Sequence, residues 1–454
     1  MKIGILAGAG DAPGEEAAVK SVRDHAQAEE VFGFMHGFRG LLRDQYRIIT
    51  SAPFDEWRGG CQLGVDRFSP FHTSKDEKGK DIIPTDPTAQ QELSEVVQAM
   101  AHTLIRHEIE GLVVMGNGKT LADANYLSDR LKNYGYRGGV VGLPVNIDND
   151  INTGTHDGTL MSCLSIGYVS AAQYIVDCIS NLTDCMNATG RIMVFETMGA
   201  DNGWLAASAA LCADVIYIPE VEVRPPVLQR GVSRTVHLFN EKRRNNNLNG
   251  VAVVCSEGIF YEDGGQLQQS SLDDVASDRK LSGAAKWLAG KTYELANKEV
   301  MRPKGNIRDG EHSLPEHLER RLNTEVYQVR PDQLDYLPRG TPVYYDVVSG
   351  RVLGEAAARM LRQPGSWGNA AVWKRILPVD QLSLDNVNMD MPLGKLTIMN
   401  FPVEYLSRTD PDQQRDIREV YLFQMVQKWK DILHTLGIRT GRLSELNRSE
   451  AYQG

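Results

Sequence analysis

Short apolar runs separated by glycine-containing polar segments dominate the first third of the chain. The runs are rich in β-branched residues, which is typical of buried strands. They predict strands at 3–7, 31–34, 111–115 and 138–144. Between them, apolar residues recur at helical spacing, which predicts helices near 17–26, 91–107 and 121–134. Strands that alternate with helices indicate a doubly wound, mainly parallel sheet.

A second series of the same kind follows. It begins with a long, mostly apolar segment at 160–183, for which we predict one helix. After it we predict strands at 191–197, 214–220 and 250–256 and helices at 203–213 and 226–240. Two successive series predict an α/β protein with two similar Rossmann-like lobes and mainly parallel sheets.

The remaining chain differs in character. Residues 262–325 are polar with few strand signals and are interpreted as a helical insertion, and residues 410–436 have the pattern of amphipathic helices. The expected organisation is a first lobe over 1–160, a second lobe over 161–375 that contains the insertion, and a C-terminal helical extension over 376–454 that packs back on the lobes.

Composition narrows the class of protein. The chain has 454 residues, and its acidic residues outnumber the basic ones by 59 to 49 without a long basic block, which argues against a nucleic-acid partner. No apolar stretch approaches the ~20 residues needed to span a bilayer. The six cysteines are scattered, as in proteins of a reducing compartment. A cytoplasmic enzyme without a membrane segment is expected.

A pair of carboxylates follows the strand at 138–144. Asp148 and Asp150 stand two residues apart in the turn NIDND, where a buried strand ends. In open α/β sheets the active site lies at this edge, so one carboxylate could accept a proton from an attacking hydroxyl while the other binds a cation or orients the first. An Asp-rich turn that caps the next helix would also explain the pattern.

Two glycine turns follow apolar strands and open helices, at 8–14 and 116–118. Backbone N–H groups at such turns and at helix N-termini bind phosphate. The segment GNGKT is similar to a P-loop, but that motif requires glycine at position 113, where this chain has Val113. A phosphate cradle assisted by Lys119 and a tight turn with an incidental lysine both stay open. We interpret Asp123, one turn further, as a partner for helix-start charges rather than a metal ligand.

Five blocks in order give the chain a family resemblance. They are GAGDAPG, GLPVNIDNDI, ETMGADNGW, CSEG and VRPDQLDYLPRG, and they lie within residues 1–375. With them the chain resembles the phosphofructokinase family, and its length and DYLPRG segment resemble the long, diphosphate-type branch. The resemblance implies phosphoryl transfer from ATP or diphosphate to the 1-hydroxyl of fructose 6-phosphate, a glycolytic reaction, with Mg²⁺ as cofactor and a homodimer or homotetramer as the assembly.

The resemblance also assigns roles to individual residues. Asp148 matches the general base, and Asp150 is its neighbouring carboxylate. Substrate-binding positions are Asn146, Arg191, Met198, Gly199, Glu257, Arg330, Tyr336 and Arg339, of which the three arginines and Tyr336 match the group that binds the sugar's 6-phosphate, some of them from a neighbouring subunit. Donor-binding positions are Gly10, Arg67, Gly116, Asn117, Gly118, Lys119 and Thr120.

Departures from the family pattern cluster around the transferred phosphoryl group. The metal-binding GGDG is replaced by GNGK, so the metal-ligand position holds Gly118 or, with a one-residue gap, Asn117. Neither supplies the carboxylate that Mg²⁺ normally requires. Asn146 replaces a threonine, Val145 replaces the glycine or lysine that signals the donor, and Ala200 replaces an arginine.

Two interpretations of these departures stay open. The donor site could have been rebuilt in an active phosphotransferase, with Lys119 supplying positive charge where the metal ligand was lost. Alternatively, the chain could be a catalytically weakened paralogue that binds a sugar phosphate as a regulatory protein. The sequence leaves the donor open between ATP and diphosphate, and the acceptor open between fructose 6-phosphate and a related sugar phosphate.

Overall fold

The computed structural model describes most of the first 375 residues. The described ranges are 1–75, 81–156, 159–200, 202–219, 223–246, 250–259, 283–297, 327–334, 337–375 and 382–388. They divide into two compact units, one formed by Met1–Ala172 with residues 337–388 and the other by residues 173–334. Tyr336, most of the segment interpreted as an insertion and the helices expected at 410–436 lie outside the described residues.

The first unit is built on a nine-stranded sheet with the order β3-β2-β1-β6-β7-β14-β9-β8, in which β15 pairs with the other side of β14. Its core strands β1, β2, β6, β7 and β14 are parallel. The bounds are β1 Lys2–Ala7, β2 Glu30–Phe34, β3 Tyr46–Ile48, β6 Ile109–Gly116, β7 Gly139–Pro144, β8 Asn152–His156, β9 Thr159–Leu164, β14 Asn369–Arg375 and β15 Leu382–Asn388. The apolar runs of the sequence became β1, β6 and β7 because a central parallel strand is buried on both faces.

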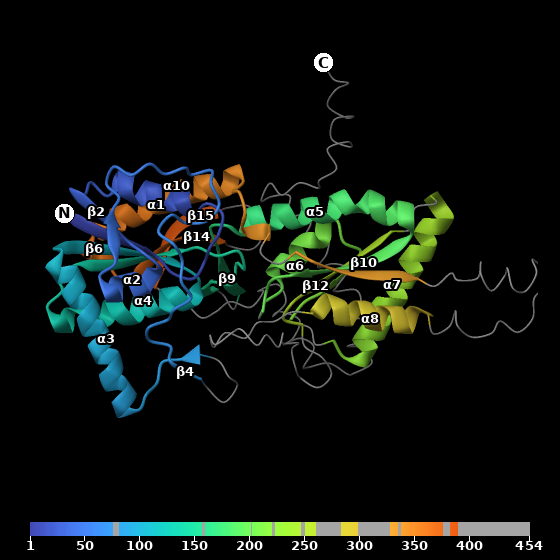
Figure 1. Cartoon of the computed structure of the whole chain (residues 1–454), viewed down its shortest axis with the longest axis horizontal. Helices are drawn as coiled ribbons and strands as arrows, with labels where there is room; N and C mark the ends of the chain where they lie inside the picture. The colour runs from blue at the N-terminus through green and yellow to red at the C-terminus, as the bar shows by residue number, and fades with distance from the viewer. Residues whose placement is uncertain are drawn as a thin grey trace, which may run out of the picture. The chain divides into compact units, whose positions relative to one another are not determined.

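Helices cover both faces of this sheet, as Figure 1 shows. On one face α1 packs along α10, and α10 contacts β6, β7 and β14; on the other face α2, α3 and α4 contact β1, β6 and β7. The bounds are α1 Glu15–His25, α2 Gly37–Arg43, α3 Pro87–Arg106, α4 Gly118–Leu131, η1 Lys132–Tyr134, η3 Leu337–Arg339, α10 Tyr344–Leu361 and η4 Pro364–Ser366. The sequence assigned residues 337–375 to the second lobe, whereas the packing of α10 on α1 places them in the first unit.

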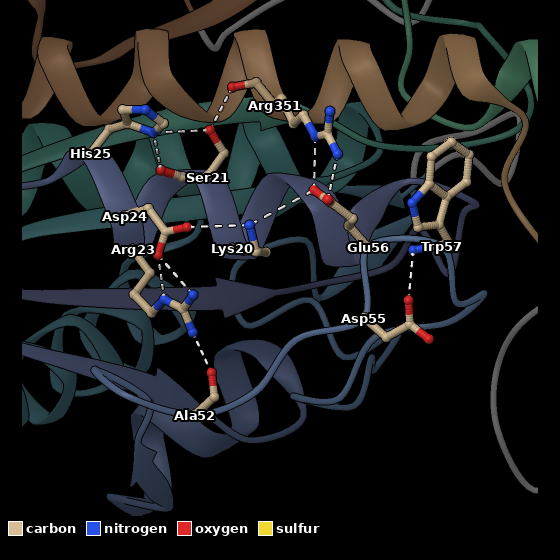
Figure 2. A network of polar contacts seen from close by, with 10 residues as sticks. All are labelled: Lys20, Ser21, Arg23, Asp24, His25, Ala52, Asp55, Glu56, Trp57 and Arg351. Atoms are coloured by element: carbon tan, nitrogen blue, oxygen red, sulfur yellow. Dashed lines mark hydrogen bonds and ion pairs between the residues drawn. The ribbon is translucent and has the colours of Figure 1, made fainter.

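Polar contacts join α1 to α10 and to the loop before residue 58 (Figure 2). Glu56 accepts a hydrogen bond of 2.8 Å from Arg351 of α10 and lies 3.9 Å from the Lys20 ammonium of α1. Arg351 holds the pKa of Glu56 below its usual value. The Ser21 hydroxyl donates to the backbone oxygen of Arg351 at 2.5 Å. These contacts fix the loop that carries the glycines at 59 and 60 against the helix pair.

The second unit has a four-stranded parallel sheet with the order β11-β12-β10-β13. α7 and α8 pack against each other and on the strands, and the short α6 contacts β10, β11 and β12. The bounds are α5 Tyr168–Thr189, β10 Arg191–Thr197, α6 Trp204–Ser208, η2 Ala209–Leu211, β11 Val215–Tyr217, α7 Pro225–Asn246, β12 Val251–Ser256, α8 Ala284–Asn297 and β13 Gln328–Gln333. α8 falls inside the expected insertion, yet it packs on β10, β12 and β13 as an integral layer of the unit.

The prediction of one helix over 160–183 is wrong at its start. Residues Thr159–Leu164 form β9, which pairs with β8 and with β14, and helix α5 begins only at Tyr168. The apolar run is compatible with both structures, and pairing with β14, about 200 residues away in sequence, decides between them. Among the described residues, no helix combines the length and apolar composition needed to cross a membrane.

Candidate functional site

The two glycine turns of the first unit are bonded to each other. The amide of Asn117 donates to the carbonyl of Ala9 at 2.7 Å, and the amide of Ala9 donates to the Thr120 hydroxyl at 3.2 Å. A Cβ atom on Gly8 would lie 2.4 Å from the Thr120 methyl carbon, so only glycine permits this approach. The turn after β1 and the turn between β6 and α4 are therefore held together by hydrogen bonds.

Asn117 acts as the N-cap of α4. Its side-chain oxygen accepts from the Thr120 amide at 3.0 Å and from the Thr120 hydroxyl at 3.1 Å. Asn is among the preferred residues at this position because its oxygen satisfies an N–H group that the helix leaves open. The structure thus gives Asn117 and Thr120 local capping roles at the start of the helix that carries Gly118 and Lys119.

The residues at this turn do not fit a Mg²⁺ ligand set. Gly118 has no side chain, and the Asn117 oxygen already accepts two hydrogen bonds. Across the described residues, no group of three His, Cys, Asp or Glu side chains could hold a metal ion. A hard divalent cation binds through several oxygens, usually including a carboxylate. This turn therefore lacks the metal ligand that the family pattern has at this position.

The NIDND turn is held by its own asparagines. The Asn146 amide nitrogen donates to Asp150 at 2.5 Å, while the Asn146 oxygen accepts from the Asn149 backbone amide at 3.1 Å. Asn149 adopts a left-handed conformation with φ +52° and accepts from the backbone of Ser165 at 3.0 Å. Asn146 and Asn149 are buried, whereas Asp148 and Asp150 are partly exposed. Both acids are thus partly exposed, although one carboxylate oxygen of Asp148 is buried, and the turn orients Asp150.

This turn is attached to the glycine turns. The amide of Val145 donates to the carbonyl of Gly116 at 2.9 Å, and a Cβ on Gly10 would lie 2.7 Å from the Val145 oxygen. The carboxyl ends of β1, β6 and β7 therefore bring the expected donor turns next to the segment with the two acids. This is the edge at which parallel α/β sheets bind ligands.

Arg339 contacts the first glycine turn. Its guanidinium donates to the backbone oxygens of Gly10 and Asp11, the latter at 3.0 Å. The residue is partly buried at the end of η3. In this conformation Arg339 stabilises the turn between β1 and α1, beside the place where the sequence expects phosphate.

Two buried glutamates begin α1 at the same turn. Glu16 accepts from the backbone amide of Gln62, and burial raises its pKa against the opposing effect of that bond. Glu15 is fully buried, and neither of its carboxylate oxygens has a hydrogen-bond partner. Burial, and then the charge of Asp11, raise the pKa of Glu15 from 4.5 to about 8. A protonated Glu15 keeps one negative charge away from the glycine turn at neutral pH.

The segment that carries Arg67 is joined to α4 by a contact that the sequence did not predict. His72 Nδ1 lies 2.6 Å from one carboxylate oxygen of Asp123, and the Ser69 hydroxyl donates to the other at 2.6 Å. Burial raises the pKa of Asp123, while His72 and then Lys119 oppose that shift. The hydrogen-bond partners of Asp123 are thus His72 and Ser69 of another segment, and the pairing with helix-start charges stays a prediction. No local sequence signal relates His72 to a residue 51 positions away.

In the second unit, Met198, Gly199 and Glu257 come together at the carboxyl ends of β10 and β12. The Gly199 amide donates to the Glu257 carboxylate at 3.0 Å, and the Ser256 hydroxyl donates to the Gly199 oxygen. Gly199 has φ +121°, and a Cβ there would lie 2.5 Å from the Asn202 oxygen. The backbone at Gly199 therefore orients the carboxylate that the sequence assigns to the sugar.

Arg191 lies at the opposite end of that sheet, and Arg330 lies near the middle of the edge strand β13. Arg191 begins β10, where its guanidinium donates to Gln328 at 3.3 Å, and Arg330 on β13 is level with Met193. Gly199 follows the other end of β10, roughly 20–25 Å away at about 3.3 Å per residue. An arginine side chain does not span that distance. The unit therefore does not bring these arginines to its own Glu257.

Comparison with known proteins identifies a family. A family model described as phosphofructokinase matches residues 2–361. The ATP-dependent 6-phosphofructokinase of Spirochaeta thermophila is 28% identical over 373 residues, which cover 80% of this chain and 85% of that protein. The pyrophosphate–fructose 6-phosphate 1-phosphotransferase of Amycolatopsis methanolica is 29% identical over 306 residues, which cover 66% of this chain and 77% of that protein. The crystal structure of a pyrophosphate-dependent phosphofructokinase from Marinobacter aquaeolei has the same fold, with a TM-score of 0.60 at 17% identity, over 94% of this chain and 91% of that one.

Proposed function

This chain belongs to the phosphofructokinase family, and we propose that it transfers a phosphoryl group from diphosphate or ATP to the 1-hydroxyl of fructose 6-phosphate or a related sugar phosphate. Relatives of similar identity are named for both donors, so both stay in the proposal. The expected α/β fold is confirmed by the likeness to solved phosphofructokinases. The proposed compartment is the cytoplasm, in agreement with scattered cysteines.

The observation that carries the proposal is the meeting of the NIDND turn with both glycine turns at one sheet edge. In the proposed reaction the 1-hydroxyl oxygen attacks the terminal phosphorus of the donor, Asp148 accepts the hydroxyl proton, and the bond from phosphorus to the leaving phosphate or ADP breaks. Asp150, held by Asn146, orients the base. Phosphoryl transfer depends mainly on such positioning and on neutralised charge.

Charge at the donor comes from this chain's own groups in the proposal. The amides of the glycine turns and the N-terminus of α4 face the phosphates, assisted by Lys119 and Arg67. No step is assigned to Mg²⁺, because the turn at 116–119 does not fit it. A preorganised cation in such a site typically accounts for about two to three decades in rate.

The sugar side requires a second copy of the chain. Met198, Gly199 and Glu257 would hold the sugar hydroxyls at one end of the second sheet, whereas Arg191 lies at the other end and Arg330 is level with Met193 in mid-strand. We propose that these two arginines bind the 6-phosphate in the site of a neighbouring subunit, as the family resemblance implies. A homo-oligomer is then needed for activity.

The test is a matrix of donors and acceptors read by phosphorus NMR. ATP and inorganic diphosphate are each combined with fructose 6-phosphate and sedoheptulose 7-phosphate. We expect a 1-phosphorylated product with at least one pair, and a loss of about 10²–10⁴-fold in Asp148→Asn. Asp129→Asn changes an exposed carboxylate on α4 and should keep full activity. A wild-type protein whose melting temperature rises with sugar phosphates but which forms no product with any pair would overturn the proposal.

A further inference from the structure

His72 and Asp123 form a close pair beside the proposed donor turn. The carboxylate of Asp123 is 1% exposed and the His72 side chain 14%, and 2.6 Å separates Nδ1 from the nearer oxygen. The other oxygen of Asp123 accepts from Ser69 at 2.6 Å. Both carboxylate oxygens therefore have partners on the segment that follows Arg67. A buried, doubly bonded carboxylate holds the imidazole ring in one orientation.

The backbone around the pair is well fixed. Phe71, between the two partners of Asp123 in sequence, is fully buried, and its ring lies 4.6 Å from that of Tyr126 on α4. Asp123 stands four residues after Lys119, and residues at this spacing share one face of a helix. Lys119 lies close enough to affect the pKa of Asp123. The His72 ring thus lies on the Lys119 side of α4, within the first two turns of the helix that the phosphate cradle opens.

The chemistry of the pair suits a phosphate ligand. Because Asp123 faces Nδ1, the second ring nitrogen Nε2 lies on the opposite side of the ring. A histidine that carries a proton on each nitrogen donates at both, so with Asp123 at Nδ1 the ring can present Nε2–H to a phosphate oxygen. A cation held in this way binds a phosphate oxygen without the reorganisation that an exposed side chain requires. The position also compensates for the carboxylate and metal that residues 116–119 lack.

We propose that His72 is a donor-binding residue, which contacts the terminal phosphates of a polyphosphate donor beside Lys119, with Asp123 as its positioning residue. The inference rests on the proposed function, which supplies the polyphosphate. It adds a third cationic side chain to Lys119 and Arg67. It also explains why a buried acid occurs at 123 in a site that binds anions: Asp123 orients the histidine.

The test measures donor binding directly and without turnover. Isothermal titration of the full chain with inorganic diphosphate and with ATP compares the wild type with His72→Gln, His72→Arg and His107→Gln. Loss of one charge-assisted bond should weaken binding of the preferred donor by about 10- to 30-fold in His72→Gln. His107→Gln is the matched control, since it removes a histidine–aspartate contact of similar length, 2.7 Å to Asp44, at the end of α3; it should change binding less than about threefold. His72→Arg, which keeps a cation, should restore most of the affinity.

Kinetics separate a binding role from a structural one. In His72→Gln the KM for the donor should rise by the same factor as the dissociation constant, while the KM for the sugar phosphate stays within about twofold. Equal losses in His72→Gln and His107→Gln would show that loss of either histidine acts only through the stability of the unit, and equal losses in His72→Gln and His72→Arg would show that a cation at position 72 is irrelevant; either result overturns the inference. A wild-type protein that binds diphosphate but never transfers phosphate would refute the proposed function alone.

Discussion

Replacement of Glu15 by Gln should remove the contribution of this residue to the pH dependence of stability in the first unit. Glu15 is fully buried, its oxygens have no hydrogen-bond partner, and its pKa is about 8 against an ordinary 4.5. Because the folded state binds this proton more tightly than the unfolded state, the stabilisation is complete below pH 4.5 and is lost as pH rises through 8. Glutamine stays neutral throughout, so its own contribution is constant.

The magnitude follows from proton linkage. Each pH unit inside the window lowers the free energy of unfolding of the wild type, relative to the variant, by about 1.4 kcal/mol. Between pH 5.5 and 8 the difference should therefore change by about 3 kcal/mol, and the variant becomes the more stable protein at the alkaline end if the buried amide costs less than that. Asp346, whose pKa burial raises to about 6, also titrates, but it is present in both proteins and cancels.

Native-state hydrogen exchange measures this locally. Peptides from β1 and α1, read by mass spectrometry at several pH values, give the opening free energy of the region that holds Glu15. Glu29→Gln, which changes an exposed carboxylate just after α1, serves as the control and should show a constant difference from the wild type. A difference between Glu15→Gln and the wild type that is the same at pH 5.5 and 8 would refute the reasoning.

Three further outcomes are expected. Gly199→Ala should lower the free energy of unfolding by roughly 1–3 kcal/mol and weaken sugar phosphate binding, because its φ of +121° and the Asn202 oxygen exclude a Cβ. Calorimetry measures the change in stability, and titration measures the change in binding. As a control, Gly290→Ala, where a Cβ meets open space, should not lower the melting temperature. With diphosphate as donor, a chelator should lower kcat by less than about tenfold, since residues 116–119 offer no carboxylate. A loss of about a hundredfold or more would show that the reaction requires a metal ion. Mixed oligomers of Asp148→Asn and Arg191→Ala subunits should recover activity that each variant lacks alone, as measured by product formation in phosphorus NMR after joint refolding; no recovery would place Arg191 in the site of its own chain or outside any site.

The sequence predicted the central strands of the first unit and the turns that follow them because the pattern that indicates each of them is local. The strands at β1, β6 and β7 are apolar runs that bury both faces, and glycine turns or acids follow their carboxyl ends. A parallel sheet then brings these ends to one edge without further information. The cap at Asn117 also has a local signal, since Asn before a helix is a known start signal.

Other features depend on pairing that a local pattern does not contain. β9 resembles a buried helix in sequence and is a strand only because β8 and β14 pair with it. β13 carries exposed polar residues and Pro331, which a strand tolerates only at the edge of a sheet. The positions of Arg191 and Arg330 relative to Glu257 likewise follow from the direction and register of the strands. Matching these arginines to the family pattern could not show that they lie far from Glu257 within one chain.

The contact between Gly8 and Thr120 has an evolutionary consequence. The two residues belong to different turns, yet the space for any atom at position 8 is already filled by the side chain at position 120. Across relatives, these positions should covary: a larger residue at 8 should be accompanied by a smaller one at 120, and adaptation at one turn would be constrained by the other.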